Sequence, residues 1–142
     1  MRAIVTPLYT ATAKAVGGRA GQVRSSDGVL DVALTRPKAM GGDGAPGTNP
    51  EQLFAAAYSA CFESAVRFVG GQAGFKPDNF SVSADVTIGK AEDKGFALAV
   101  VLTVDMPDVD RGKAMELVEK AHQTCPFSHA TRGNIEVRLQ LA

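Results

Sequence analysis

The chain carries no net excess of charge, since 15 Lys and Arg residues balance 15 Asp and Glu residues. A neutral chain attracts polyanions weakly, so we expect neither nucleic acid nor an anionic membrane surface as a partner. No apolar run approaches the length needed to cross a bilayer. The start, MRAIVTPLYT, has no long apolar stretch and no cleavage-site pattern, so we expect no signal peptide and a cytoplasmic location.

Cysteine is scarce, with Cys61 and Cys125 as the two copies in 142 residues. Two thiols in a reducing compartment seldom form a structural disulfide, so a functional pair is more often catalytic, redox-sensing or metal-binding. A phosphate-binding loop is also missing, because the Gly- and Pro-rich segment 36–48 does not end in Gly-Lys-Ser/Thr. We expect a loop there and assign it no nucleotide.

Short strands are expected in the first third of the chain, where β-branched residues partly alternate between glycine turns. The candidate runs are TATAKAV (10–16), AGQVRSS (20–26) and VLDVALT (29–35). Asp27-Gly28 between the last two favours a hairpin. Further strands are indicated by the alternating FSVSADVTI (80–88), by FALAVVLTVDM (96–106), which is apolar on both faces and therefore central, and by NIEVRLQLA (134–142).

Two helices are predicted between these strands. The first starts near Pro50, with either Asn49 as N-cap or a Thr48–Glu51 capping box, and should end after about Val69 at Gly70-Gly71. The second is capped by Asp108 or Asp110, buries a stripe of apolar residues and ends at Cys125, because Pro126 disfavours helical geometry in the residue before it. This order predicts one α+β domain over residues 1–142, with a largely antiparallel sheet packed on two helices.

The surroundings of Cys61 favour an inert thiol when its helix is considered alone. Residues three, four and seven positions away share its face, and they are nearly all apolar: Phe54, Ala57, Tyr58, Ser64, Ala65 and Phe68. A buried cysteine behaves as a small hydrophobe with a raised pKa. The opposite face carries Glu63 and Arg67, a solvated i,i+4 pair. Any cation that activates Cys61 must therefore come from another part of the fold.

Cys125 leaves a metal site open as an alternative. His122 and His129 flank it in the pattern H-x2-C-x3-H, and two imidazoles with two thiols can bind zinc. The spacing matches no strong zinc signature, because Cys-x2-Cys is missing and a proline follows the middle ligand. His122 is more typical of a surface histidine, and we predict no bound metal.

Three motifs together resemble the OsmC/Ohr superfamily, and most closely its organic hydroperoxide resistance (Ohr) branch. They are GGRAG (17–21), GTNPEQLFAAAYSACF (47–62) and KAHQTCPFSHATRGNIEV (120–137), and the resemblance covers essentially the whole chain. It implies an intertwined homodimer of largely antiparallel sheets on two central helices. It also implies that Cys61 is the peroxidatic cysteine and Cys125 the resolving one, while Arg19 and Glu51 hold the reactive thiol as a thiolate.

This resemblance implies a thiol peroxidase that reduces alkyl or fatty-acid hydroperoxides to alcohols. No cofactor would be bound, and a lipoyl-bearing protein would be the external dithiol reductant. The residues expected to contact the organic chain are Met40, Phe54, Tyr58, Phe62 and Phe127. Two positions depart from the common pattern: Phe127 stands where Tyr is frequent, and His129 stands where Asn is frequent. Neither change removes a catalytic group, although Phe127 lacks a hydroxyl.

The spacing of Glu51 and Cys61 predicts how a site would be assembled. Ten residues on one helix separate them by roughly 15 Å along its axis, which a glutamate and an arginine hardly span within one chain. Arg19 and Glu51 are therefore expected to serve Cys61 of a partner chain in a dimer.

Three classes of function remain open from the residues. The first is the peroxidase, of the Ohr or the OsmC branch. The second is a thiol-based redox sensor or ligand carrier without turnover, which the lack of a DNA-reading element and of a basic patch disfavours. The third is a small structural metal protein. Turnover separates the first from the second, and metal analysis addresses the third.

Overall fold

The computed structural model describes residues 2–142, so residue 1 of the expected 1–142 domain lies outside the described residues. The chain divides into two compact units, one ending at Leu53 and the other comprising Phe54–Ala142. Each unit has a sheet of its own. The two units are described separately below.

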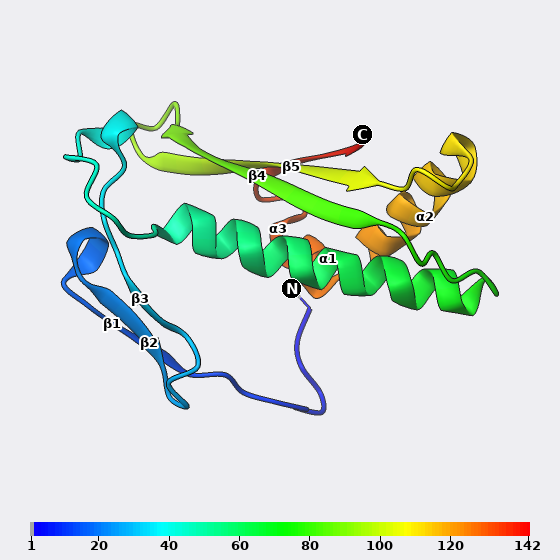
Figure 1. Ribbon diagram of the computed structural model, residues 1–142, viewed down its shortest axis with the longest axis horizontal. Helices are drawn as coiled ribbons and strands as arrows, with labels where there is room; N and C mark the ends of the chain where they lie inside the picture. The colour runs from blue at the N-terminus through cyan, green and yellow to red at the C-terminus, as the bar shows by residue number, and fades with distance from the viewer. Residues whose placement is uncertain (1) are drawn as a thin grey trace. The chain divides into compact units, whose positions relative to one another are not determined.

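The first unit is built on a three-stranded antiparallel sheet in the order β1-β2-β3 (Figure 1). Its strands are β1 (Ala13–Val16), β2 (Gln22–Ser25) and β3 (Asp31–Ala33). The predicted hairpin joins β2 to β3, and Gly28 takes a positive φ of 73° in its turn. Between β1 and β2 lies the short 3-10 helix η1 (Gly18–Ala20). It requires glycine at position 21, because a Cβ there would collide with the Val16 carbonyl oxygen.

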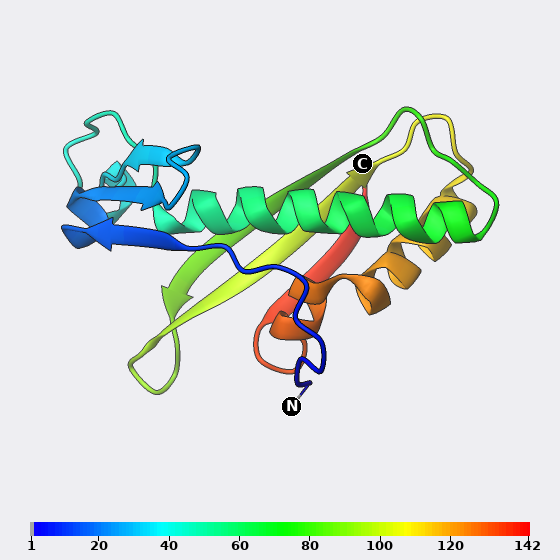
Figure 2. The same ribbon diagram turned by 90° about the horizontal axis from the view of Figure 1, so that it is seen from below.

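An extended arm precedes β1, since residues 2–12 contain no helix or strand (Figure 2). Four apolar side chains on this arm are 83–95% exposed: Ile4, Val5, Leu8 and Tyr9. Four large apolar residues exposed on one short segment form a surface that folding of the chain alone leaves in water.

The segment between β3 and the first long helix is a loop, as expected, with the short 3-10 helix η2 (Lys38–Met40) inside it. The helix α1 (Pro50–Gln72) follows, and Asn49 caps it by accepting a hydrogen bond from the Gln52 amide at 2.8 Å. The prediction that Gly70-Gly71 ends α1 is wrong. Gly70 is buried inside the helix, and Gly74, with a φ of 72°, turns the chain instead.

The second unit holds a mixed sheet in the order β4-β5-β6. Its strands are β4 (Ser81–Lys90), β5 (Phe96–Asp105) and β6 (Glu136–Leu141). β5 is central, as its two apolar faces predict, and it pairs antiparallel with β4 and parallel with β6. The parallel pair follows from the crossover through α2 (Arg111–Thr124) and the short α3 (Pro126–Thr131). The residue that caps α2 is Asp110, whose carboxylate accepts from the Lys113 amide at 3.1 Å.

The helices of this unit lie on one face of its sheet, and the core fills the space between them (Figures 1 and 2). The predicted stripe of α2 is buried in full: Ala114, Leu117, Val118, Ala121 and Cys125. The alternating residues of β4 and β6 pack against the same core. Glu63 and Arg67 form their expected ion pair at 2.6 Å on the opposite face of α1.

The fold is therefore α+β, with two small sheets and three α-helices among residues 2–142. The short α3 is an addition to the two predicted helices. Of the helices in this part of the chain, none has both the length and the hydrophobicity needed to span a membrane.

Candidate active site

The two cysteines, 64 residues apart in sequence, meet inside the second unit. Cys61 is half-buried on α1, and Cys125 is fully buried at the joint between α2 and α3. Both are free thiols, and the Cys125 thiol donates a hydrogen bond to the Cys61 sulfur at an Sγ–Sγ distance of 3.5 Å. A disulfide has an S–S distance of about 2.05 Å, so a small approach of the two sulfurs is sufficient to close one.

The surroundings of Cys61 within this unit oppose its ionisation. Burial raises the pKa of the Cys61 thiol, and the neighbouring Cys125 sulfur raises it further because two adjacent thiols oppose each other's ionisation. A hydrogen bond from the Phe127 backbone acts in the opposite direction, because an amide donor stabilises the thiolate. None of these groups in the unit 54–142 is a cation. The sequence-based expectation that activation needs a charge from elsewhere therefore agrees with the local chemistry.

Arg19 and Glu51 form a bidentate ion pair inside the first unit. The Arg19 Nη1 and Nη2 atoms donate to the two Glu51 carboxylate oxygens at 2.8 and 2.6 Å. Arg19 is presented by η1, and Glu51 lies in the first turn of α1. Because Asn49 supplies the helix cap, the Glu51 carboxylate is available to Arg19, and the alternative Thr48–Glu51 capping box is not used.

This pair stays charged at neutral pH. The hydrogen bond from Arg19 holds the pKa of Glu51 below its usual value, and the same bond raises the pKa of Arg19. The fork arrangement fixes the plane of the guanidinium, which leaves its remaining N–H groups aimed in a fixed direction. Arg19 also lines an open hollow of about 690 Å³ in the first unit, together with Arg36 and the turn at Gly41 and Gly42.

Five residues were predicted to contact the organic part of the substrate, and four of them form one aromatic cluster in the second unit. Phe54 stacks on Phe127 at 6.3 Å between ring centroids, and Tyr58 meets both rings edge-on at 5.9 and 5.7 Å. Phe62 meets Tyr58 at 6.5 Å. Tyr58 and Phe62 are completely buried, whereas Phe54 and Phe127 are half-buried and keep surface for a ligand.

The remaining predicted residue, Met40, lies half-buried at the end of η2 in the first unit. The two unusual positions have clear neighbours. Phe127 completes the aromatic stack in place of a tyrosine. His129 has its Nδ1 atom 3.2 Å from the Arg132 guanidinium.

Sequence reasoning missed a group of buried hydroxyls beside the cysteines. Ser128 and Thr131 on α3 are both within hydrogen-bond distance of the Tyr58 hydroxyl, at 2.9 and 3.2 Å. Ser128 also contacts the His122 Nδ1 atom at 2.8 Å. The one signal in the sequence is spacing, because His122 and Ser128 each lie three residues from Cys125.

The metal alternative receives no support from the geometry. Across residues 2–142, no three His, Cys, Asp or Glu side chains gather as they would around a metal ion. The His122 ring is instead directed to Ser128.

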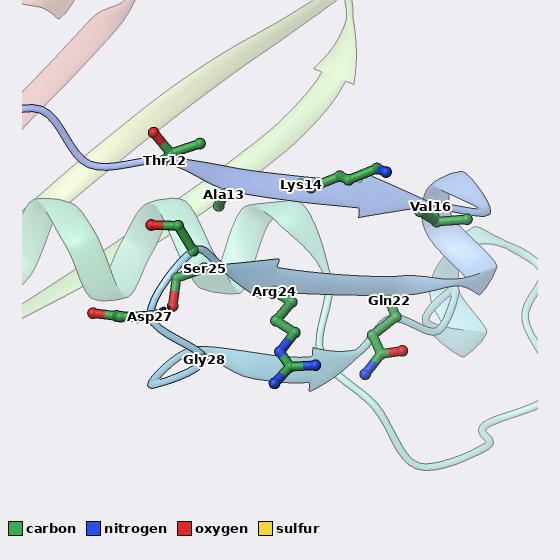
Figure 3. A pocket seen from close by; sticks show the side chains of 10 residues that line it. Thr12, Ala13, Lys14, Val16, Gln22, Arg24, Ser25, Asp27 and Gly28 are labelled. Carbon is green, nitrogen blue, oxygen red and sulfur yellow. Dashed lines mark hydrogen bonds between the residues drawn. The ribbon is translucent and has the colours of Figure 1, made fainter.

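A second hollow, of about 510 Å³, lies over β1 and β2 in the first unit (Figure 3). Lys14, Gln22 and Arg24 project along it, and Ser25 and Asp27 close one end. None of the predicted site residues lines it. Most of its lining residues are exposed residues of β1, β2 and the turn after β2, so it is a feature of the sheet surface rather than of the cysteine site.

The sequence was compared with protein families and with known proteins, and both comparisons indicate the same family. The family described as "OsmC-like protein" matches residues 41–140. An organic hydroperoxide resistance protein of Xanthomonas axonopodis pv. citri is 50% identical over 136 residues, covering 95% of each chain. The organic hydroperoxide resistance protein OhrB of Bacillus subtilis is 48% identical over 135 residues, covering 94% of this chain and 98% of its own.

Superposition on solved structures indicates the same family as the sequence comparisons. The crystal structure of Bacillus subtilis OhrB superposes with a TM-score of 0.90 at 47% identity, covering 96% of this chain and 100% of that one. An organic hydroperoxide resistance protein from Legionella pneumophila superposes with a TM-score of 0.91 at 44% identity, covering 96% and 99%. The chain therefore belongs to the OsmC/Ohr superfamily, in its organic hydroperoxide resistance branch.

Proposed function

We propose that this protein is a thiol peroxidase that reduces organic hydroperoxides to alcohols. The observation that carries the proposal is the meeting of two free thiols at 3.5 Å, one half-buried and one fully buried. The relatives that span nearly the whole chain are named organic hydroperoxide resistance proteins. Reaction with a peroxide is a chemistry that uses two such thiols in sequence.

The first step is attack of the Cys61 thiolate on one oxygen of the O–O bond. The S–O bond forms as the O–O bond breaks, so Cys61 becomes a sulfenic acid and the alkoxide leaves, takes a proton and departs as the alcohol. In the second step Cys125 attacks the sulfenic sulfur, a Cys61–Cys125 disulfide forms and water is lost. An external dithiol then reduces this disulfide by exchange, and we propose a lipoyl-bearing protein for that role.

Arg19 is the proposed activating cation. Guanidinium stays protonated at all physiological pH values, and it can stabilise both the Cys61 thiolate and the charge on the leaving alkoxide. Glu51 orients it through the two hydrogen bonds at 2.6 and 2.8 Å. Because the local environment raises the pKa of Cys61, this charge is needed for reaction at neutral pH.

We propose further that Arg19 and Glu51 act on Cys61 of a second copy of the chain. The helix α1 runs unbroken from Pro50 to Gln72, so Glu51 and Cys61 lie roughly 15 Å apart along its axis. The exposed apolar arm supports a dimer, because Ile4, Val5, Leu8 and Tyr9 need a partner to leave water. Phe68, 56% exposed on α1, is a further apolar residue that such a partner would cover.

Mixing two inactive variants tests this assembly. Arg19→Ala chains and Cys61→Ser chains should each be inactive alone. Unfolded and refolded together in equal amounts, they should recover about a quarter of wild-type activity, because half of the dimers are mixed and each has one intact site of two. A site contained within one chain predicts no recovery, so a mixture that stays inactive despite proven chain exchange would refute the shared site.

Preference for organic over inorganic peroxide tests the function itself. With a dithiol present, tert-butyl hydroperoxide should be consumed at least about a hundredfold faster than hydrogen peroxide, since burying four carbon groups contributes about 0.8 kcal/mol each. The half-buried Phe54 and Phe127 are the proposed contacts. The measurement is kcat/KM for both substrates by peroxide assay. A redox sensor would instead be oxidised once by the peroxide and would not turn over.

A further inference from the structure

A single hydrogen bond bridges the two sides of Cys125. The His122 Nδ1 atom, three residues before it on α2, is 2.8 Å from the Ser128 Oγ atom, three residues after it on α3. Between them Cys125 is in extended conformation, with φ −61° and ψ 126°. The bridge therefore closes the joint between two helices at the point where the buried thiol is attached.

The same serine hydroxyl connects this joint to the helix of the other cysteine. Ser128 Oγ is 2.9 Å from the hydroxyl of Tyr58, which lies three residues before Cys61 on α1. The Tyr58 hydroxyl is also 3.2 Å from the Thr131 Oγ1 atom. Ser128 and Tyr58 are completely buried, so these bonds are shielded from competing water.

The distances alone leave the donor open in the contacts of Tyr58 with Ser128 and Thr131 and of Ser128 with His122. Counting protons assigns a direction to each of them when all of these contacts are hydrogen bonds. The Thr131 hydroxyl donates to backbone carbonyl oxygens, that of Phe127 at 3.0 Å and that of Ser128 at 3.2 Å, so its one proton is used. Tyr58 must then donate to Thr131, which leaves Ser128 to donate to Tyr58. His122 must in turn donate its Nδ1 proton to Ser128.

The result is one directed chain, His122 → Ser128 → Tyr58 → Thr131. It requires His122 to carry a proton on Nδ1. Burial lowers the pKa of His122, and the neighbouring Arg132 and His129 lower it further, so the ring is neutral at neutral pH. Neutral His122 is then the Nδ1–H tautomer, the minor form of free histidine in water.

We infer that this directed chain is a clamp that positions Cys125 for disulfide closure, with the hydroxyls of Ser128 and Tyr58 as positioning residues for the second chemical step. The inference rests on the proposed function for its biological use. The sulfurs must approach from 3.5 Å to bonding distance, and a buried thiol approaches only along the direction its backbone permits. Loosening the joint widens the spread of Sγ–Sγ distances and slows closure.

Thiol exchange measures closure without any peroxide. A disulfide dye such as dithionitrobenzoate reacts first with half-buried Cys61 and releases one thionitrobenzoate anion. Buried Cys125 then attacks the mixed disulfide, which forms the Cys61–Cys125 bond and releases the second anion. The ratio of the second rate to the first measures how fast the Cys61–Cys125 disulfide forms. It can be measured even in a protein that consumes no peroxide.

The variants are Ser128→Ala and Tyr58→Phe, which remove one hydroxyl each. We expect the ratio to fall about three- to tenfold, as loss of one buried hydrogen bond implies. Ser64→Ala is the matched control, because its hydroxyl lies three residues beyond Cys61 and bonds only the Ala60 carbonyl oxygen of its own helix. Thr131→Ser should preserve the ratio, and Thr131→Val should lower it.

Nitrogen NMR of His122 tests the direction of these hydrogen bonds independently of the rate of disulfide formation. The reduced wild-type protein should show the Nδ1–H tautomer, and Ser128→Ala should shift it toward Nε2–H. A wild-type Nε2–H tautomer would overturn the proposed direction of the hydrogen bonds. Variants that melt at a lower temperature but keep the same ratio of the two dye-release rates as Ser64→Ala would overturn the positioning role. Failure of the proposed function looks different: normal closure with the dye but no reaction with organic peroxide.

Discussion

Replacing Cys61 with serine should lower organic hydroperoxide consumption by more than about three orders of magnitude, the size of effect seen when an enzyme loses its nucleophile. A serine hydroxyl has nearly the same volume but does not ionise at neutral pH, and its oxygen is a poor nucleophile toward an O–O bond. Cys61 is half-buried on α1, so the replacement leaves the core intact. The measurement is peroxide consumption with excess dithiol.

Ser64→Ala is a suitable control for that loss. It lies on the same helix, and its hydroxyl bonds only a backbone carbonyl oxygen at 2.9 Å. Both variants should unfold at denaturant concentrations close to that of the wild type. Substantial activity in a folded Cys61→Ser protein would assign the reaction to another residue, and Cys125 would be the first to examine.

The second large effect is expected for Cys125→Ser. The Cys61 sulfenic acid should still form, because the first step does not use Cys125. Without the thiol at 3.5 Å it has no partner in the chain, so excess peroxide should carry it on to the sulfinic acid, which thiols do not reverse. Turnover supported by a lipoyl dithiol should stop within a few cycles.

Mass spectrometry of the Cys61 peptide distinguishes the outcomes for this variant. The wild type should show the disulfide and little sulfinic acid at the same peroxide excess. A Cys125→Ser protein that resists over-oxidation and turns over with lipoyl dithiol at the wild-type rate would remove Cys125 from the mechanism.

The element types were largely predictable from the sequence, because each depends on local patterns. Alternation in 80–88 and the two apolar faces of 96–106 correspond to β4 and the central β5. The end of α1 was not predictable in this way, because a pair of glycines usually stops a helix. Here Gly70 is buried, and a Cβ at this position would press on the Phe75 carbonyl oxygen, so the glycine serves close packing inside the helix.

The short helix α3 was also missed. Its six residues are too few to show helical periodicity, and Pro126, which predicts a helix end at Cys125, also starts the new helix at its first position. The extended conformation expected of Cys125 is present. One proline thus ends one helix and begins the next, with the thiol between them.

For the site, the residues alone left Cys61 as an inert thiol, and only resemblance paired it with Cys125. The structure adds the 3.5 Å contact, which no spacing rule predicts for residues 64 apart. The Arg19–Glu51 pair was anticipated in the same way, and its two short hydrogen bonds follow from η1 and the first turn of α1. The hydroxyls of Ser128 and Thr131 were invisible because their partner, Tyr58, is 70 or more residues away.

The most direct measurement treats fully reduced protein with one equivalent of an alkyl hydroperoxide and maps its thiols by peptide mass spectrometry. The predicted result is a disulfide between Cys61 and Cys125 of the same chain, formed rapidly and in nearly full yield, with much slower formation when hydrogen peroxide is used. Two intact thiols after the alkyl hydroperoxide has been added, or oxidation that never joins Cys61 to Cys125, would contradict a two-cysteine peroxidase.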